Sequence, residues 1–113
     1  MDLSDEKQRN KFEKTSKLNP GMIPVIFSFY KGLTKYSYGL IASPEVTTAR
    51  LISHLMKKGI GNFLGPYGGV FMFLFGKIVN MDTAIEKLFN VNVDNGNSGP
   101  VDIMLGTAAM FGN

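Results

Sequence analysis

The first stretch of the chain is polar and carries few apolar residues. Acidic and basic side chains alternate from Met1 to Lys17. Ser4 can cap a helix that has two acidic residues in its first turn, where they meet the positive end of the helix dipole, and Asn19-Pro20-Gly21 ends it. The pattern predicts a charged helical arm over residues 1–21 that contributes no core.

Residues 22–58 are predicted to form two amphipathic helices that lie at a membrane surface. In the first, from Val25 to Ile41, apolar residues recur at helical spacing on one face. A spanning orientation would place Lys31 and Lys35 near the bilayer centre, at a cost of about 2.5–3.5 kcal/mol each. This helix is therefore expected to lie flat in the interface, unless it is an ordinary amphipathic helix of a soluble protein.

The second of these helices has the best local boundary signals in the chain. Ser43 suits the N-cap, Pro44 the first helical position, and Gly59 the position after the last turn. One arc of this helix is apolar, and the opposite arc is basic. The candidate binding residues on that basic arc are Arg50, Lys57 and Lys58, which could meet either lipid head groups or an acidic partner; the alternative is a solvated face, where His54 also fits.

An uncharged, glycine-rich stretch runs from Gly59 to Gly76. As one helix it would rise about 27 Å, close to the hydrocarbon thickness of a bilayer. Residues 59–81 are therefore predicted to contain a transmembrane helix. Pro66 leaves a second arrangement open, a loop followed by a shorter helix, and in a soluble protein Val70 to Phe75 would instead be a buried strand with alternating phenylalanines.

Three glycines in this stretch form a candidate helix-packing site. Gly61, Gly65 and Gly69 repeat every four residues, so one face of an unbroken helix would be smooth enough for another helix to approach closely. The prediction is that a neighbouring transmembrane helix packs against these glycines.

After the predicted span the pattern again becomes that of a water-exposed chain. Thr83 and Glu86 suit a capping box for a short helix, and a polar loop follows from Val91 to Pro100. Pro100 could begin a last short helix in an apolar tail. Residues 82–113 are thus predicted to hold a short helix, a polar loop and an apolar C-terminal tail.

Composition limits the chemistry that this chain can perform. Its 113 residues suit one domain, and they include no cysteine and one histidine. Disulfides, thiolate nucleophiles and Cys or His metal cages are excluded, and no catalytic, cofactor-binding or metal-binding residues are predicted, so we expect no enzyme and no cofactor. The net charge of +3 would suit a nucleic acid, but three permanent charges make a sparse basic arc, and no nucleic-acid partner is expected.

The segment Phe29-Tyr30-Lys31-Gly32-Leu33, followed by a basic helix and one span, resembles subunit f of mitochondrial ATP synthase over about residues 25–79. The resemblance implies an amphipathic segment on the matrix side and one helix across the inner membrane. It implies a subunit that scaffolds neighbouring helices and catalyses nothing. The sequence differs from that family in Thr34-Lys35 and in its longer tail, and an accessory subunit of another respiratory-chain complex is an equally open interpretation.

The sequence therefore predicts a mainly α-helical fold of amphipathic interfacial helices, one glycine-rich transmembrane helix that can kink, and short terminal helices. The expected function is that of a non-catalytic accessory subunit of a membrane complex in the mitochondrial inner membrane. Basic residues before the span place the N-terminal half in the matrix. The expected partners are other subunits and anionic lipids such as cardiolipin. The alternative is a soluble helical protein-interaction module.

Overall fold

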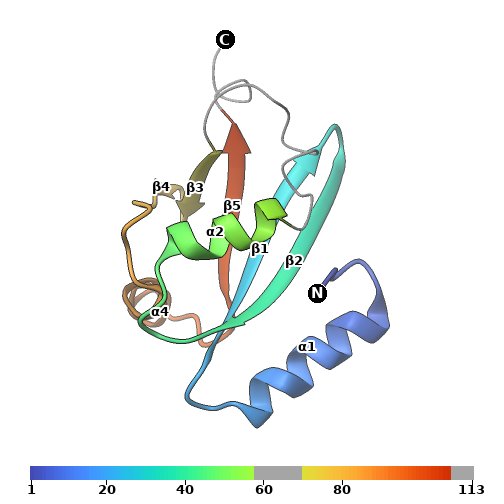
Figure 1. The fold of residues 1–113 in the computed structure, drawn as a ribbon, viewed down its shortest axis with the longest axis vertical. Coiled ribbons are helices and arrows are strands. Elements are labelled where there is room, and N and C mark those ends of the chain that lie inside the picture. Colours follow the sequence, from blue (N-terminus) through green and yellow to red (C-terminus); the bar gives the residue numbers. More distant parts are fainter. Residues whose placement is uncertain (58–69, 108–113) are drawn as a thin grey trace.

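A computed structural model describes residues 1–57 and 70–107. Three helices and five strands are defined in these residues, and both kinds of element are mixed along the chain (Figure 1). In chain order they are α1 (Glu6–Leu18), β1 (Ile23–Lys31), β2 (Thr34–Ala42), α2 (Thr48–Lys57), β3 (Val70–Leu74), β4 (Lys77–Ile78), α4 (Ile85–Asp94) and β5 (Val101–Thr107).

The five strands form one sheet in the order β2-β1-β5-β3-β4. The neighbours β1 and β5 run parallel, and the other neighbours run antiparallel. Figure 1 shows α2 crossing one face of the sheet, whereas α1 lies alongside β2. The strands β2 and β4 are the two edges, and β4 has only two residues.

The region from Ile23 to Ala42 is a β-hairpin, so the prediction of an interfacial helix over Val25 to Ile41 is wrong. Gly32, with a φ of 63°, opens a two-residue loop between β1 and β2, and glycine at the first loop position is typical of tight hairpins. Ile23, Val25, Phe27 and Phe29 are all buried, which is the two-residue period of a strand. The same residues also fit a helical spacing. They form a strand because the backbone of β1 pairs with both β2 and β5.

The end of the uncharged stretch is a strand rather than part of a transmembrane helix. Met72 and Leu74 of β3 are buried, whereas Phe71 and Phe75 are 40% and 50% exposed. The strand interpretation of Val70 to Phe75 is confirmed, although the even-numbered residues and not the phenylalanines face the core. A tight turn at Phe75-Gly76, where both φ angles are positive, then leads into β4.

Helix α1 confirms the helix predicted in residues 1–21, but the expectation that this arm contributes no core is wrong, because Leu3 and Phe12 are buried. Its side-chain cap is Asp5, which accepts a hydrogen bond from the Lys7 N–H, and not Ser4 as predicted. The helix predicted before Gly59 is also present, but α2 begins at Thr48 and not after Ser43, and the predicted end at Lys58 and Gly59 lies outside the described residues.

The segment before α2 holds the start of α4 through backbone hydrogen bonds. The carbonyl oxygens of Pro44 and Val46 accept hydrogen bonds from the Glu86 and Ile85 N–H groups, at 2.9 and 2.8 Å. These bonds satisfy the first N–H groups of α4, which a side-chain cap would otherwise satisfy. The predicted helix in this region is therefore confirmed, but its Thr83–Glu86 capping box is wrong: the N-cap is Ala84, which makes no side-chain capping bond.

The C-terminal part of the described chain is a central strand. Helix α4 extends to Asp94, and after the loop the chain enters β5, where Val101, Ile103 and Leu105 are buried at alternating positions. The prediction of a last helix beginning at Pro100 is wrong because β5 fills the gap between β1 and β3.

One core lies between the sheet and the helices α2 and α4. It includes Phe27 and Ile103 from the sheet, Leu55 from α2 and Ile85 from α4, all almost fully buried. None of the helices within residues 1–57 and 70–107 has the length and the apolar content that crossing a membrane requires. The predicted mainly α-helical class is thus wrong, since the apolar residues pack a helix-covered sheet.

Candidate functional site

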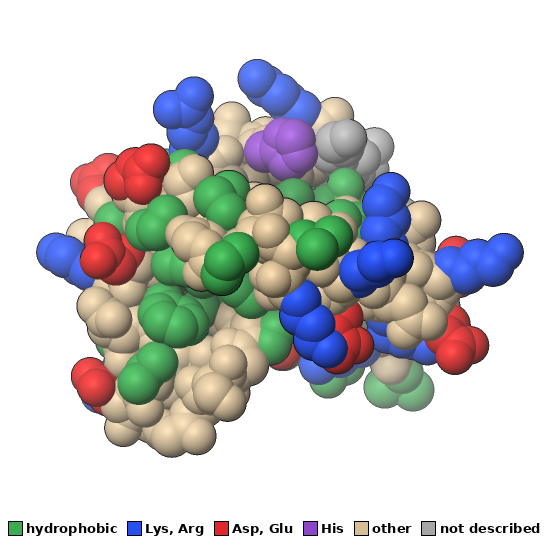
Figure 2. Space-filling model, turned by 90° about the horizontal axis from the view of Figure 1, so that it is seen from below, with side chains coloured by type: hydrophobic (Ala, Val, Ile, Leu, Met, Phe, Trp, Pro, Cys, Tyr) green, Lys and Arg blue, Asp and Glu red, His purple; other side chains and the backbone are tan. Residues whose placement is uncertain are grey.

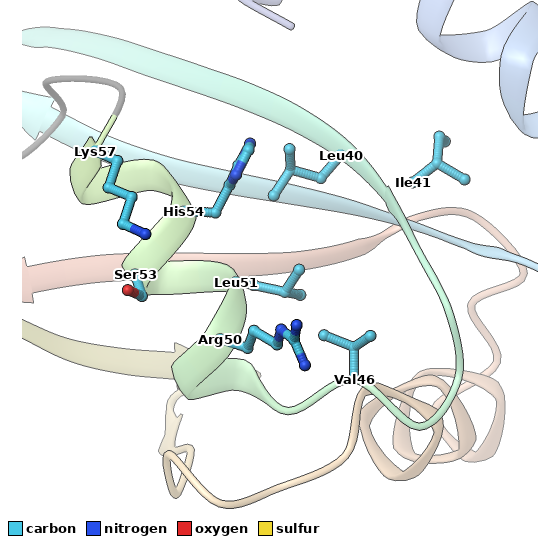
Figure 3. Close-up of a pocket in the computed structure, with 8 residues that line it drawn as sticks. All are labelled: Leu40, Ile41, Val46, Arg50, Leu51, Ser53, His54 and Lys57. Carbon is cyan, nitrogen blue, oxygen red and sulfur yellow. The ribbon is translucent and has the colours of Figure 1, made fainter.

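The candidate site is a groove between the edge strand β2 and the helix α2. It encloses about 520 Å³ and is open to solvent. Figure 3 shows its lining side chains projecting from β2, from α2 and from the segment between them. They are Leu40, Ile41, Val46, Arg50, Leu51, Ser53, His54 and Lys57.

The periodicity of α2 explains why apolar and basic side chains meet here. Leu51, Ile52 and Leu55 are buried in the core, whereas the side chains on the opposite side of α2 are exposed. Arg50, His54 and Lys57 follow one another at helical spacing and therefore share one side of α2. In Figure 3 the His54 ring and Leu40 point toward one another across the groove, and the Arg50 guanidinium lies beside Val46.

The charge of the groove is positive. Arg50 and Lys57 carry permanent charges, and no acidic side chain is among the lining residues. Figure 2 shows Lys and Arg side chains on both sides of the single histidine and a band of hydrophobic side chains beside it. The site thus offers an apolar floor with a basic rim.

The outer edge of β2 runs next to this groove and is paired with the first residues of the chain. The Gly39 N–H donates to the Met1 carbonyl oxygen over 2.8 Å, and the Leu3 N–H donates to the Ser37 carbonyl oxygen over 2.9 Å. Between these bonds, Asp2 and Tyr38 form an antiparallel β-bridge. We call residues Met1–Leu3 the N-terminal segment.

A short turn follows the N-terminal segment. The Ser4 N–H donates to Asp2 Oδ1 over 2.9 Å. This hydrogen bond, followed by the Ser4 side chain and the nearby N-terminal charge, lowers the pKa of Asp2 from its ordinary value of 3.8. The charged carboxylate therefore helps to hold the turn between the N-terminal segment and α1.

Helix α1 is attached to β2 through one aromatic side chain. Phe12 is 5% exposed, and its ring lies over Gly39, so closely that a Cβ atom at position 39 would stand 2.7 Å from Phe12 Cδ2. A second hollow, of about 390 Å³, lies between α1 and β1 and has Leu3, Phe12 and Ile26 among its lining residues.

The structure brings together two of the three predicted binding residues of the basic arc. Arg50 and Lys57 line the groove with His54, whereas Lys58 lies outside the described residues. The predicted helix-packing glycines, Gly61, Gly65 and Gly69, also lie outside them.

The apolar half of the groove cannot be recognised from the helical pattern. That pattern places Leu40 and Ile41 in one helix and Val46 in the first turn of the next, and not opposite the basic arc. The signal that could have found them is the alternation of Tyr36, Tyr38 and Leu40, which marks one face of a strand.

Within residues 1–57 and 70–107, no three His, Asp or Glu side chains are grouped closely enough to hold a metal ion.

Comparison with known proteins identifies the fold. No protein-family model matches this chain, and none of the curated proteins matches it by sequence. Its structure is similar to the crystal structure of Trypanosoma brucei ATG8, with a TM-score of 0.61 and 13% sequence identity over 89% of this chain and 85% of that one. The chain therefore has a ubiquitin-like fold of the ATG8 type.

This fold corrects the predicted function and location. The accessory-subunit interpretation and the mitochondrial inner-membrane location both depended on a transmembrane helix, and in the described part of the span β3 and β4 belong to the sheet. Both predictions are wrong, and the interaction-module alternative agrees better with the fold, although its elements are not all helical. The similarity to ATG8 does not bear on the resemblance to subunit f.

Proposed function

We propose that this chain is a protein-interaction module that binds an extended peptide segment of a partner protein. The segment would lie along β2 and place an apolar side chain and acidic side chains in the groove between β2 and α2. The observation that carries this proposal is the groove itself, in which Arg50 and Lys57 border an apolar floor beside a sheet edge. The module would act by binding alone.

The edge position of β2 supports an extended partner. The backbone groups at Ser37 and Gly39 that face away from β1 already pair with a short extended segment, which shows that this edge accepts antiparallel pairing. Addition of a peptide strand to a sheet edge is a recurring recognition mode, in which main-chain hydrogen bonds provide affinity and pockets for side chains provide specificity. Here the adjacent groove would be the pocket.

The charge of the groove supports an acidic partner. The permanent charges of Arg50 and Lys57 would attract carboxylates and accelerate association, whereas a basic peptide would be repelled. Leu40, Val46 and Leu51 would receive one apolar side chain of the same peptide. This extends the predicted role of Arg50 and Lys57 as contacts for an acidic partner.

The test is a selection of random peptides displayed on phage against the full chain. Recovered peptides should combine acidic residues with one large apolar residue, and they should shift the backbone NMR signals of Leu40 and Val46. Arg50→Glu should weaken their binding about tenfold or more, because it replaces attraction by repulsion. Lys87→Glu, the same charge reversal at an exposed position of α4 outside the groove, is the matched control and should leave the binding unchanged.

Two results would overturn the proposal. One is recovery of peptides without acidic residues, or of peptides whose binding Arg50→Glu leaves unchanged. The other is that the selection recovers no peptide and the protein instead binds cardiolipin or phosphatidylserine vesicles, with weaker vesicle binding after Arg50→Glu. The groove would then be a lipid site.

A further inference from the structure

The edge that a partner strand would need is already covered by the chain itself. The N-terminal segment runs antiparallel to β2, with Met1 opposite Gly39 and Leu3 opposite Ser37. The Met1 amino group also donates to the Gly39 carbonyl oxygen over 2.9 Å. Both backbone groups of Gly39 are therefore in use, one residue before Leu40 enters the groove.

The N-terminal segment has a defined anchor. Leu3 is 9% exposed, and its carbonyl oxygen accepts a hydrogen bond from Arg9 Nη1 over 2.9 Å. Asp2 and Ser4 are exposed. The segment is thus held by a few edge hydrogen bonds and one apolar side chain, while α1 has its own attachment through Phe12. Apart from the Arg9 bond, its contacts are separate from that of Phe12, so the segment can leave β2 while Phe12 keeps α1 in place.

We propose that the N-terminal segment is an intramolecular competitor that occupies the β2 edge and must be displaced before a partner strand can pair there. This inference rests on the proposed function, because it assigns a regulation to the same site. The physical basis is exclusion: the Gly39 N–H and the Ser37 carbonyl oxygen face one side, and two strands cannot pair with that side at once. The apparent affinity for a partner is then the intrinsic affinity multiplied by the fraction of molecules whose edge is open.

A disulfide can lock the segment in place and test this. Asp2 and Tyr38 lie between the hydrogen-bonded pairs, and such cross-strand positions have Cα atoms about 4.5 Å apart, within the range that a disulfide bridges. The chain has no cysteine of its own, so the double variant with Asp2→Cys and Tyr38→Cys would form a single, defined disulfide. The reduced and oxidised forms of this variant are matched controls for each other, because they have the same sequence.

The probe is the peptide recovered most often in the selection described above. The reduced variant should bind it, and oxidation should weaken binding about tenfold or more, since the open fraction falls toward zero. Equal binding in the two redox states would overturn the competition while leaving the docking groove intact. Absence of binding by both the reduced variant and the unmodified chain would instead contradict the proposed function, so the two failures are distinguishable.

A second variant tests the opposite direction. Leu3→Asp removes the apolar anchor of the segment and should tighten peptide binding, whereas Leu33→Asp, the same change at a fully exposed loop position, should not. Unchanged or weaker binding by Leu3→Asp would contradict the inference.

Hydrogen exchange distinguishes displacement of the N-terminal segment from peptide binding at another place on the protein. When the peptide is added to the unmodified chain, the Leu3 amide should lose protection because its acceptor, Ser37, is taken over. The Gly39 amide should remain protected, because a carbonyl group of the peptide replaces that of Met1. Continued protection of Leu3 in the bound state would show that the segment stays on β2 and would overturn the proposal.

Discussion

Replacement of Gly39 by alanine tests how α1 is attached to the sheet. The new Cβ atom would lie 2.7 Å from Phe12 Cδ2 and 2.8 Å from Phe12 Cε2, and ordinary contact begins at 3.4 Å. The ring must therefore retreat by about 0.7 Å, from 2.7 to at least 3.4 Å. Phe12 is a rigid ring buried between α1 and β2, so the whole of α1 has to shift with it.

The expected cost follows from overpacking. Forcing extra atoms into a packed contact destabilises a protein by about 1–3 kcal/mol. The upper bound is set by complete release of Phe12, because burial of a phenylalanine side chain contributes about 1.5–3 kcal/mol. In a Phe12→Ala background the clash is absent, and Gly39→Ala should then stabilise the strand by about 0.5–1 kcal/mol, since glycine is unfavourable inside a strand. The sign of the effect should reverse between the two backgrounds.

The assay is a double-mutant cycle measured by urea unfolding of the unmodified chain, both single variants and the double variant. The coupling free energy between positions 12 and 39 should be about 2 kcal/mol or more. Amide exchange in α1 should accelerate in Gly39→Ala and show which element has moved. If Gly39→Ala destabilises the protein equally with and without Phe12, the contact between ring and backbone is not what holds α1.

Four further substitutions test hydrogen bonds and turns in the rest of the fold. Thr48→Val should cost about 1–3 kcal/mol in urea unfolding, because the buried Thr48 hydroxyl donates to the Asn80 and Met81 carbonyl oxygens at 2.9 and 2.8 Å; a neutral result would contradict that role. Asn92→Ala should cost a similar amount, since the buried Asn92 side-chain amide donates to the Gly99 carbonyl oxygen over 3.0 Å; an unchanged free energy of unfolding would argue against it. Phe75→Asn should raise the midpoint of thermal unfolding, because a bulky residue at a φ of 50° is strained and asparagine suits this turn; a lower midpoint would mean that Phe75 packing outweighs the strain. Asp2 should titrate below 3.8 by NMR and return toward 3.8 in Ser4→Pro; because its pKa is lowered in the folded chain, its contribution to stability is present above 3.8 and is lost as the pH falls through the lowered value.

Helices whose formation depends on neighbouring residues in the chain could be predicted from the sequence. The charged run of Glu6–Leu18 and its following Pro-Gly predicted α1, and Thr83 and Glu86 predicted a short helix at the place of α4, although they do not form its capping box. The basic side of α2 was also predicted correctly, because residues at positions 50, 54 and 57 share a helix face in any helix that contains them. Two of the three binding candidates therefore reached the candidate groove.

Elements that depend on distant partners could not be predicted in this way. Val25 to Ile41 satisfies a helical period and a strand period at once, and only pairing of β1 with β5 selects the strand. The start of α2 was misplaced because the carbonyl groups of Pro44 and Val46 bond to α4 and not to the next turn of a helix. A long uncharged run likewise fits a bilayer or the interior of a sheet, and local hydropathy is the same in both cases.

By itself the sequence determined the single-domain size, the absence of cysteine chemistry, the helices at α1 and α4 and the basic side of α2, because composition and short-range periodicity are properties of neighbouring residues. Only the tertiary structure decided that other apolar segments form a sheet, that Leu40 and Val46 face Arg50 across a groove, and that Met1–Leu3 cover the edge beside it. These arrangements come from hydrogen bonds and contacts between residues far apart in the chain. Their free energy becomes available only when the whole core has formed, so no local pattern can record it.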